Sequence, residues 1–280
     1  MVLAKETSTG HAQAGTDWLD VHFQAARDEY EEALRYVGVQ PGWRVLDAGC
    51  GGGGFLPLMS QLVGSQGAVV ALDLAPENVA HVEALVRGGS LPTNVAARVG
   101  SLLSLPFQDA TFDCVWSANV MQYLSDAEFG HAVAEFKRVL KPGGTLAIKD
   151  LDDTLTQFFP MDPGLMARFG MARRAESAQA GALGLSCGPT LPSRLRRTGL
   201  TDIRRKSWLV ERWAPLGPAA RNFVEAVFPH WATLAAKFNI SPEDMQSLQE
   251  VASNSSILLD DPDFCYREGF VVAVGRVAIG

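Results

Sequence analysis

The chain has 280 residues, of which 47% are apolar, and a formal net charge of −7. This length suits one large α/β domain or a domain with a lid, and the apolar fraction is ample for a core. The negative charge argues against nucleic acid as a partner. No apolar run approaches the roughly 18 residues that a membrane-spanning helix needs, so we expect no membrane partner.

Residues 1–16 are polar and small, contain no apolar stretch typical of a signal peptide, and are expected to be disordered. The cysteines at 50, 114, 187 and 265 form no C-x-x-C pair. We therefore expect no metal ion and a reducing compartment, which indicates a cytoplasmic protein.

A helical pattern of apolar residues covers 18–37, and a turn follows at 39–42. An apolar run, Arg44 to Leu46, then ends in Asp47 and opens into residues 49–54, of which five are glycine. The next apolar residues recur at helical spacing, and they are Phe55, Leu58, Met59 and Leu62. This segment predicts a strand, a glycine turn and a helix, in which glycine lets the backbone adopt positive φ and approach a ligand closely.

Residues 49–54 formally match the G-x-G-x-x-G dinucleotide fingerprint, with Asp73 as a candidate ribose ligand. Asp47 at the strand tip would repel a pyrophosphate, however, and residues 45–86 contain no Lys or Arg. A cationic cofactor suits the negative electrostatic field of this segment better than a pyrophosphate does. A nicotinamide-dependent dehydrogenase is therefore only a residual alternative. Cys50 is either a reactive thiol or, as we favour, a small loop residue in contact with the cofactor.

The D-x-G-x-G-x-G pattern of residues 47–53 resembles motif I of the class I S-adenosylmethionine-dependent methyltransferases, and the chain is similar to their small-molecule, UbiE-like (type 11) members. Three further segments resemble this family in the same order. Residues 69–73 resemble its second strand, 104–113 its LPF-x-D-x-x-FD segment, and 136–144 its turn into strand five. Together the motifs cover about residues 40–150.

The resemblance implies S-adenosyl-L-methionine as the cofactor. It implies that Asp73 holds the ribose, the glycine backbone the methionine portion, and Ser101 with Leu102 the adenine, while Asn119 lies near the amino group. Ser101 stands where the family often has an acid, and serine is a weaker acceptor for the adenine amino group. The complete set of cofactor-binding candidates is Asp47, Gly49, Gly51, Gly53, Asp73, Leu74, Ser101, Leu102 and Asn119.

Residues 117–123 follow strand four and should face the methyl group, because ligands of open α/β sheets bind outside the carboxyl ends of strands. Relatives often carry histidine at the position of Gln122 or Tyr123, and neither residue is a ready general base at neutral pH. The catalytic candidates are therefore Tyr123 and His230, although a lone histidine such as His230 is more often structural. The identity of a general base stays open.

In similar methyltransferases the helix at 18–37 closes over the cofactor. His22, Arg27 and Tyr30 are then candidates for the methionine end, although we favour a simple packing role for Tyr30 and Phe23.

The resemblance implies a Rossmann-like α/β fold, with a seven-stranded, mostly parallel sheet, helices on both faces and a helical lid inserted around strand six. The expected divisions are 1–16 disordered, 17–150 cofactor-binding core with an N-terminal cap helix, 151–190 lid insertion, 191–212 core helix and strand six, 213–263 second lid insertion, and 264–280 strand seven.

The inserts are long enough to be functional. The aromatic residues of the inserts are Phe158, Phe159, Trp213, Phe228 and Trp231. They are candidates to line an apolar substrate pocket. The alternative is that they form a core within the lid, and we expect this of more than half of them. Nine of the 24 basic residues fall between Arg168 and Lys206, which indicates either an anionic substrate or, as we favour, solvated helix faces.

We expect methyl transfer by in-line displacement to a small, largely apolar acceptor, such as a secondary metabolite. A macromolecule methyltransferase is a second possibility, which a small, salt-insensitive substrate would exclude. A third is a protein that keeps the cofactor as a scaffold for another reaction such as cyclisation, which turnover without S-adenosylhomocysteine would identify. The acceptor atom (O, N or C), the substrate and the oligomeric state stay open.

Overall fold

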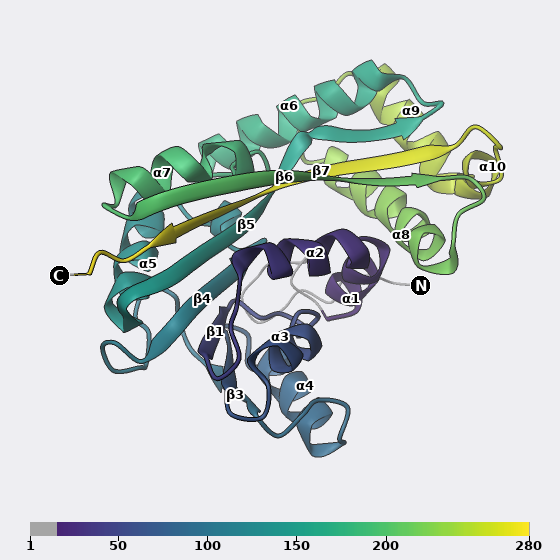
Figure 1. Ribbon diagram of the computed structural model, residues 1–280. Coiled ribbons are helices and arrows are strands. Elements are labelled where there is room, and N and C mark those ends of the chain that lie inside the picture. Colours follow the sequence, from purple (N-terminus) through teal and green to yellow (C-terminus); the bar gives the residue numbers. More distant parts are fainter. Residues whose placement is uncertain (1–15, 280) are drawn as a thin grey trace.

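The computed structural model describes residues 16–279, so the disorder expected for residues 1–16 lies outside the described residues except at Thr16, which begins a helix. A seven-stranded sheet runs through the molecule in the order β3-β2-β1-β4-β5-β7-β6 (Figure 1). Its strands are β1 (Arg44–Ala48), β2 (Ala68–Asp73), β3 (Val95–Val99), β4 (Phe112–Ala118), β5 (Leu140–Phe159), β6 (Thr201–Trp213) and β7 (Cys265–Arg276). β7 runs antiparallel to β5 and β6, and the other pairs are parallel. The predicted seven-stranded, mostly parallel sheet is confirmed.

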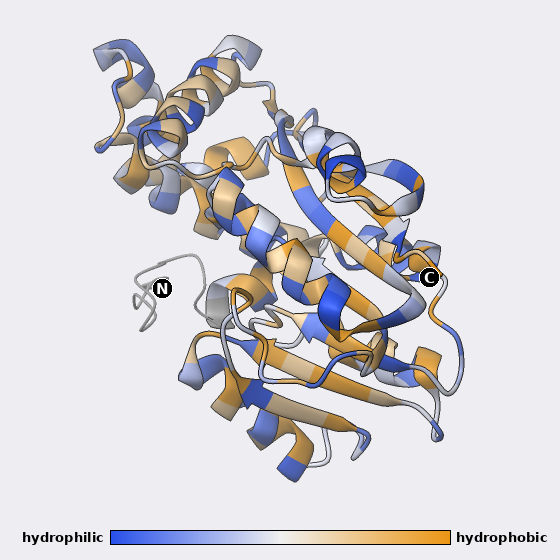
Figure 2. Cartoon of the chain, turned by 90° about the vertical axis from the view of Figure 1, so that its left-hand side faces the viewer, coloured by the Kyte–Doolittle hydropathy of each residue, from blue (hydrophilic) through white to orange (hydrophobic). Residues whose placement is uncertain are grey.

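Helices cover both faces of the sheet, as expected for a Rossmann-like fold. One core contains residues of α2 (Arg27–Val37), α3 (Leu56–Val63) and α4 (Pro76–Arg87), and the other contains residues of α5 (Asp126–Val139) and α7 (Leu191–Arg197). Successive strand residues alternate between the two cores, because side chains of a strand point to opposite faces. On β1, Val45 belongs to the first core and Leu46 to the second. The strands are accordingly largely hydrophobic in Figure 2, whereas the helices mix both kinds of residue.

Local sequence signals account for where several helices begin. Pro57 and Pro76 lie in the first turns of α3 and α4, where a backbone N–H has no helical partner to lose. Ser125 and Glu128 form a capping box at the start of α5, in which the Ser125 backbone N–H donates to Glu128 Oε2 at 2.8 Å.

The helix expected over residues 18–37 is divided into α1 (Thr16–Ala25) and α2. The break falls at Ala26, whose φ and ψ are −111° and 14°. Ala26 is fully buried, and its N–H donates to the carbonyls of His22 and Phe23. Because α2 packs against β6 while α1 packs against the glycine turn and the C-terminal helices, the two segments need different directions.

Strand five does not end at the division expected at residue 150. β5 continues beyond residue 150 because β7 pairs with it from Thr145↔Arg276 to Phe159↔Cys265, with a change of register between Asp152 and Gln157. β6 likewise extends to Trp213 beside the same strand. Residues 151–159 thus continue the sheet, and the division expected at residue 150 falls inside a strand.

The remaining helices gather around the far ends of these three long strands (Figure 1). They are α6 (Pro163–Gln179), α8 (Pro218–Ala235), α9 (Pro242–Ser253) and α10 (Ser255–Leu259). Buried residues of α6, α8 and α9 join the core that also contains α2 and α3. That these helices act as a lid stays a prediction.

The capping box gives a test of the local folding signals. We expect Ser125→Ala to lower the free energy of unfolding by about 1 kcal/mol, because the N–H of Glu128 loses its acceptor. The measurement is urea denaturation followed by circular dichroism. Ser256→Ala, at an exposed serine of α10, is the matched control and should change stability little. Equal effects of the two substitutions would contradict the assignment.

Candidate active site

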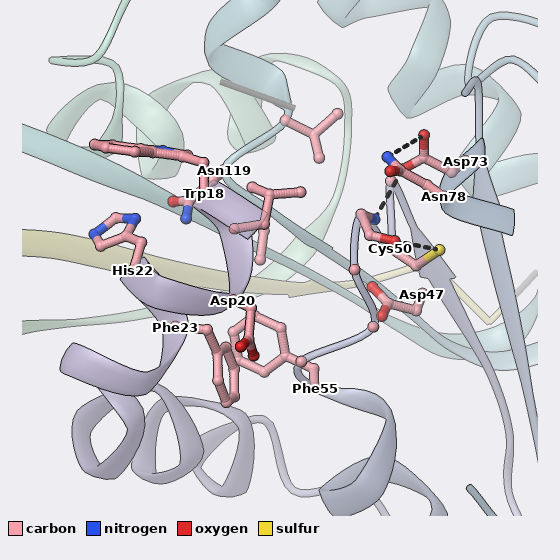
Figure 3. A pocket seen from close by; sticks show the side chains of 18 of the residues that line it. Trp18, Asp20, His22, Phe23, Asp47, Cys50, Phe55, Asp73, Asn78 and Asn119 are labelled. Carbon is pink, nitrogen blue, oxygen red and sulfur yellow. Dashed lines mark hydrogen bonds between the residues drawn. The ribbon is translucent and has the colours of Figure 1, made fainter. Parts of the chain in front are cut away.

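A cavity of about 830 Å³ lies at the carboxyl ends of β1 to β4 and is bounded by α1 and by the long end of β5. Its size falls within the range of roughly 300–1,000 Å³ typical of small-molecule sites. In Figure 3, Asp47, Cys50 and Asp73 lie on the side of the glycine turn, and Trp18 and His22 lie on the side of α1. All nine predicted cofactor-binding residues and Tyr123 line this cavity.

The glycine turn, residues 49–54, needs glycine for conformation and for space. Gly49 and Gly51 have φ angles of +86° and +52°. A Cβ atom at Gly49 would lie 2.4 Å from Val120 Cγ2, and one at Gly51 would lie 2.6 Å from Leu19 Cδ1 of α1. Neither distance is tolerable, so larger residues would push away both α1 and the loop after β4. The glycine turn therefore keeps its backbone open to the cavity.

Asp73 ends β2 and lies beside this turn. Its Oδ2 accepts a hydrogen bond from the Gly51 N–H at 2.8 Å, and its Oδ1 accepts from the Ala75 N–H at 2.9 Å and from Asn78 Nδ2 at 3.2 Å. A carboxylate offers about four acceptor positions, so one remains for a ligand hydroxyl. This geometry suits the ribose role predicted for Asp73.

Asp47 is 2% exposed, and its Oδ2 has no hydrogen-bond partner among residues 16–279. Burial, reinforced by the nearby Asp73 carboxylate, raises the pKa of Asp47 to about 8. A buried carboxyl without a donor is costly unless a ligand supplies one. The site therefore fits a ligand that brings positive charge, and a pyrophosphate would be repelled.

The part of the cavity wall predicted to border the adenine contains the Ser101 hydroxyl, which already accepts a hydrogen bond within the protein. Ser101 Oγ accepts a hydrogen bond from the Leu103 N–H at 3.1 Å, and Leu102 is half-buried beside it. At the opposite part of the wall, Asn119 Oδ1 accepts from the fully buried Lys149 Nζ at 2.7 Å. Lys149 thus holds the Asn119 amide in place, which was not anticipated from the sequence.

A buried group of titratable side chains joins α1 and α2 to β7. His22 Nε2 lies 2.8 Å from Glu268 Oε1, and the Tyr30 hydroxyl donates to the same oxygen at 3.4 Å. Burial opposes ionisation of Glu268, but His22 and Lys149 hold the pKa of Glu268 below its usual value. Glu268 belongs to no sequence motif, and the only signal for it is an acid inside the apolar run of strand seven.

The catalytic candidates have different positions. Tyr123 lines the cavity, where burial raises the pKa of its phenol above the usual value and keeps it protonated. His230 is not among the residues that line the cavity, and its ring lies 4.9 Å from that of Trp18. Burial, with Arg173 nearby, lowers the pKa of His230 to about 4. Of the two candidates, Tyr123 therefore lines the cavity and His230 does not.

The insert aromatics and Cys50 each had two possible roles in the sequence analysis, and their positions in the structure distinguish these roles. Of the five insert aromatics, Trp231 lines the cavity, whereas Phe158 and Phe228 pack together with ring centroids 4.8 Å apart. The larger part of the set thus belongs to the protein core. Cys50 lines the cavity but is buried, and burial raises the pKa of its thiol well above the usual value, so it is not a reactive thiolate.

Comparison with known proteins agrees with this geometry. Residues 45–144 match the family described as "Methyltransferase domain". The chain is 37% identical over 146 residues to malonyl-[acyl-carrier protein] O-methyltransferase of Erwinia billingiae, which covers 50% of this chain and 53% of the relative.

The chain is also 25% identical over 238 residues to 27-O-demethylrifamycin SV methyltransferase of Amycolatopsis mediterranei. This match covers 80% of this chain and 80% of the relative. Residues 45–144 therefore carry the methyltransferase domain of the class I S-adenosylmethionine-dependent enzymes. The chain spans between 38% and 53% of the length of the first curated relatives that it matches.

The fold of the chain is shared with the solved [4+2]-cyclase SpnF, at a TM-score of 0.54 and 20% identity over 90% of this chain and 81% of that one. The family cofactor is S-adenosylmethionine, and the open glycine backbone, Asp73 and the unpartnered Oδ2 of Asp47 fit it. Among residues 16–279 no group of three His, Cys, Asp or Glu side chains could hold a metal ion, and no helix is long and apolar enough to cross a membrane.

The raised pKa of Asp47 predicts a pH dependence of stability without cofactor. The folded protein holds a proton on Asp47 up to about pH 8, whereas the free carboxyl has a pKa of 3.8. The contribution of Asp47 to the free energy of unfolding is therefore complete below about pH 4 and lost as the pH rises to about 8. We expect the free energy of unfolding of Asp47→Asn to exceed that of the natural protein at pH 8 by about 1–3 kcal/mol.

This prediction is checked by denaturant unfolding of both proteins at pH 5 and pH 8 without cofactor. Added S-adenosylmethionine should stabilise the natural protein more than the variant, because a cation favours the ionised carboxylate. A stability difference that does not change with pH would show that Asp47 does not titrate as described.

Proposed function

We propose that this protein transfers a methyl group from S-adenosylmethionine to a small, largely apolar molecule. The observation that carries the proposal is that one cavity joins an acidic glycine cradle to a wall of apolar side chains. That wall includes Trp18, Leu151, Leu185, Phe223, Val227 and Trp231. A cofactor in the cradle would therefore present its reactive end to an apolar acceptor.

The proposed roles of the cofactor-binding residues follow from their positions. Asp73 would bind the ribose hydroxyls, the backbone of Gly49 to Gly53 would follow the methionine portion, and Asp47 would face positive charge. Ser101 with Leu102 would border the adenine, Leu74 would lie beside the ribose, and Asn119 would lie near the amino group. These assignments agree with the cavity lining and with the hydrogen bonds at Asp73.

S-adenosylmethionine supplies a methyl group already activated by its sulfonium. The chain then needs chiefly to align the acceptor and to exclude water, and alignment of this kind can offset roughly 7–11 kcal/mol of barrier. The packing of α1 on the glycine turn supports such an enclosed site. The buried His22, Tyr30 and Glu268 group lies on the same wall and would help to orient the acceptor.

The acceptor class is supported by the name of one relative, 27-O-demethylrifamycin SV methyltransferase, which matches over most of both chains. From it we infer a small-molecule acceptor of secondary metabolism. The malonyl group of the other relative is carried by a protein.

The cofactor assignment is tested at Asp73. We expect Asp73→Ala to weaken S-adenosylmethionine binding at least tenfold in isothermal titration calorimetry, because hydrogen bonds to a charged group contribute about 1.5–3 kcal/mol. The control is Asp263→Ala, at an exposed acid that does not line the cavity, which should leave the affinity unchanged. Unchanged affinity in Asp73→Ala would reject the ribose role, and binding of NAD in place of S-adenosylmethionine would reject the whole proposal.

Transfer itself is tested with a cofactor that carries an isotopically labelled methyl group and with metabolite extracts. We expect a labelled small molecule and an equal amount of S-adenosylhomocysteine, both identified by mass spectrometry. Conversion of a metabolite without S-adenosylhomocysteine would instead indicate that the cofactor serves as a scaffold.

A further inference from the structure

Arg173 of α6 reaches the cavity at the end away from Asp73. It lines the cavity together with Tyr123, Asp153 and Trp231. Its guanidinium carbon lies 5.5 Å from the ring centroid of Phe169 and 5.7 Å from that of Trp231. Within residues 16–279 the guanidinium makes no hydrogen bond and no ion pair closer than 4.0 Å, and it is held by aromatic surfaces alone.

This position separates Arg173 from the other basic residues between Arg168 and Lys206, all of which are described. Five of them already have acceptors within the protein: Arg168 with Asp244, Arg174 with Asp153, Arg194 with Asp126, Arg204 with the carbonyls of Tyr36 and Val37, and Lys206 with Glu32. Arg196, Arg197 and Arg205 are exposed. The charge-rich segment is therefore mainly protein surface, and Arg173 is its one member that lines the cavity.

A guanidinium has five N–H donors and stays charged in proteins, so the partial burial of Arg173 without acceptors is unfavourable. Burial lowers the pKa of Arg173 from its usual value, and Asp153 opposes this effect. Neither nearby acid accepts a hydrogen bond from Arg173. Asp153 Oδ1 accepts from Arg174 Nη1 at 3.1 Å while its Oδ2 has no partner among residues 16–279, and Glu268 binds His22. The donors of Arg173 are thus available to a ligand.

We propose that Arg173 binds a carboxylate of the methyl acceptor, which makes the acceptor an apolar organic acid. This inference rests on the proposed methyl transfer and specifies its substrate class. The planar fork of arginine matches a carboxylate through two parallel hydrogen bonds. Asp153 and Glu268 lie close enough to repel a second negative charge, so a monoanion suits the site better than a phosphate dianion.

The apolar body of such an acid would lie between Arg173 and the cofactor end. Leu151, Phe223 and Val227 line that part of the cavity with Trp231. Arg173 would fix the orientation of the acceptor, and so acts as a specificity residue that positions it.

The test uses the full chain saturated with S-adenosylhomocysteine, and two pairs of probes, cinnamate with cinnamamide and decanoate with decanamide. Calorimetry measures the affinity of each acid and of its neutral amide. We expect at least one acid to bind tenfold or more tightly than its amide. Arg173→Gln should abolish that preference, whereas Arg173→Lys should retain part of it because the charge remains.

The matched control is Arg196→Gln, at an exposed arginine of α7, which should keep the preference of the natural protein. Thermal unfolding of each variant confirms that it is folded. No preference for either acid, or a preference that survives in Arg173→Gln, would overturn the inference while leaving the proposed function intact. A loss of S-adenosylhomocysteine affinity in Arg173→Gln would assign the residue to the cofactor carboxylate instead and also overturn it. If the natural protein does not bind S-adenosylhomocysteine, the proposed function fails first, and the inference fails with it.

Discussion

The packing of α1 directly on the glycine turn is the constraint on which the site depends. Leu19 and Phe23 lie where Cβ atoms of Gly51 and Gly54 would be, at 2.6 Å and 2.7 Å. Only a turn without side chains lets the helix come so close. The same contact keeps the glycine turn in the cavity wall and places apolar side chains over it. Binding surface and enclosure therefore arise from one feature, and both would be lost together if the turn gained side chains.

Charged side chains of opposite sign line different parts of the cavity. Asp47 and Asp73 lie on the side of the glycine turn, and Arg173 lies on the side of the insert helices. Charge interactions are stronger inside a protein cavity than in bulk water. This arrangement therefore favours a cation at one end of the cavity and an anion at the other. Such polarity would direct two ligands into one relative orientation, which is what an in-line transfer requires.

The long antiparallel pairing of β5 with β7 makes the second half of the site. It extends the sheet past the carboxyl ends of β1 to β4 and carries Asp153 and Glu268 to the cavity wall. Glu268 meets His22, and Arg212 of β6 binds Glu29 of α2, so the N-terminal helices are attached to the C-terminal strands. The cover of the cavity is thus held by charged contacts between the two ends of the described chain.

The sequence by itself determined the cofactor end. The glycine turn, Asp73 and the first-turn prolines Pro57 and Pro76 are local signals, and the ends of parallel strands necessarily meet at one edge of a sheet. Only the tertiary structure decided which residues lie at the end of the cavity that we propose for the acceptor. The break at Ala26, the length of β5, the meeting of His22 with Glu268 and the choice of Arg173 among nine basic residues depend on the register of strands and on packing between segments far apart in the chain. Periodicity and composition carry no information on such pairings, because many registers bury the same apolar residues equally well.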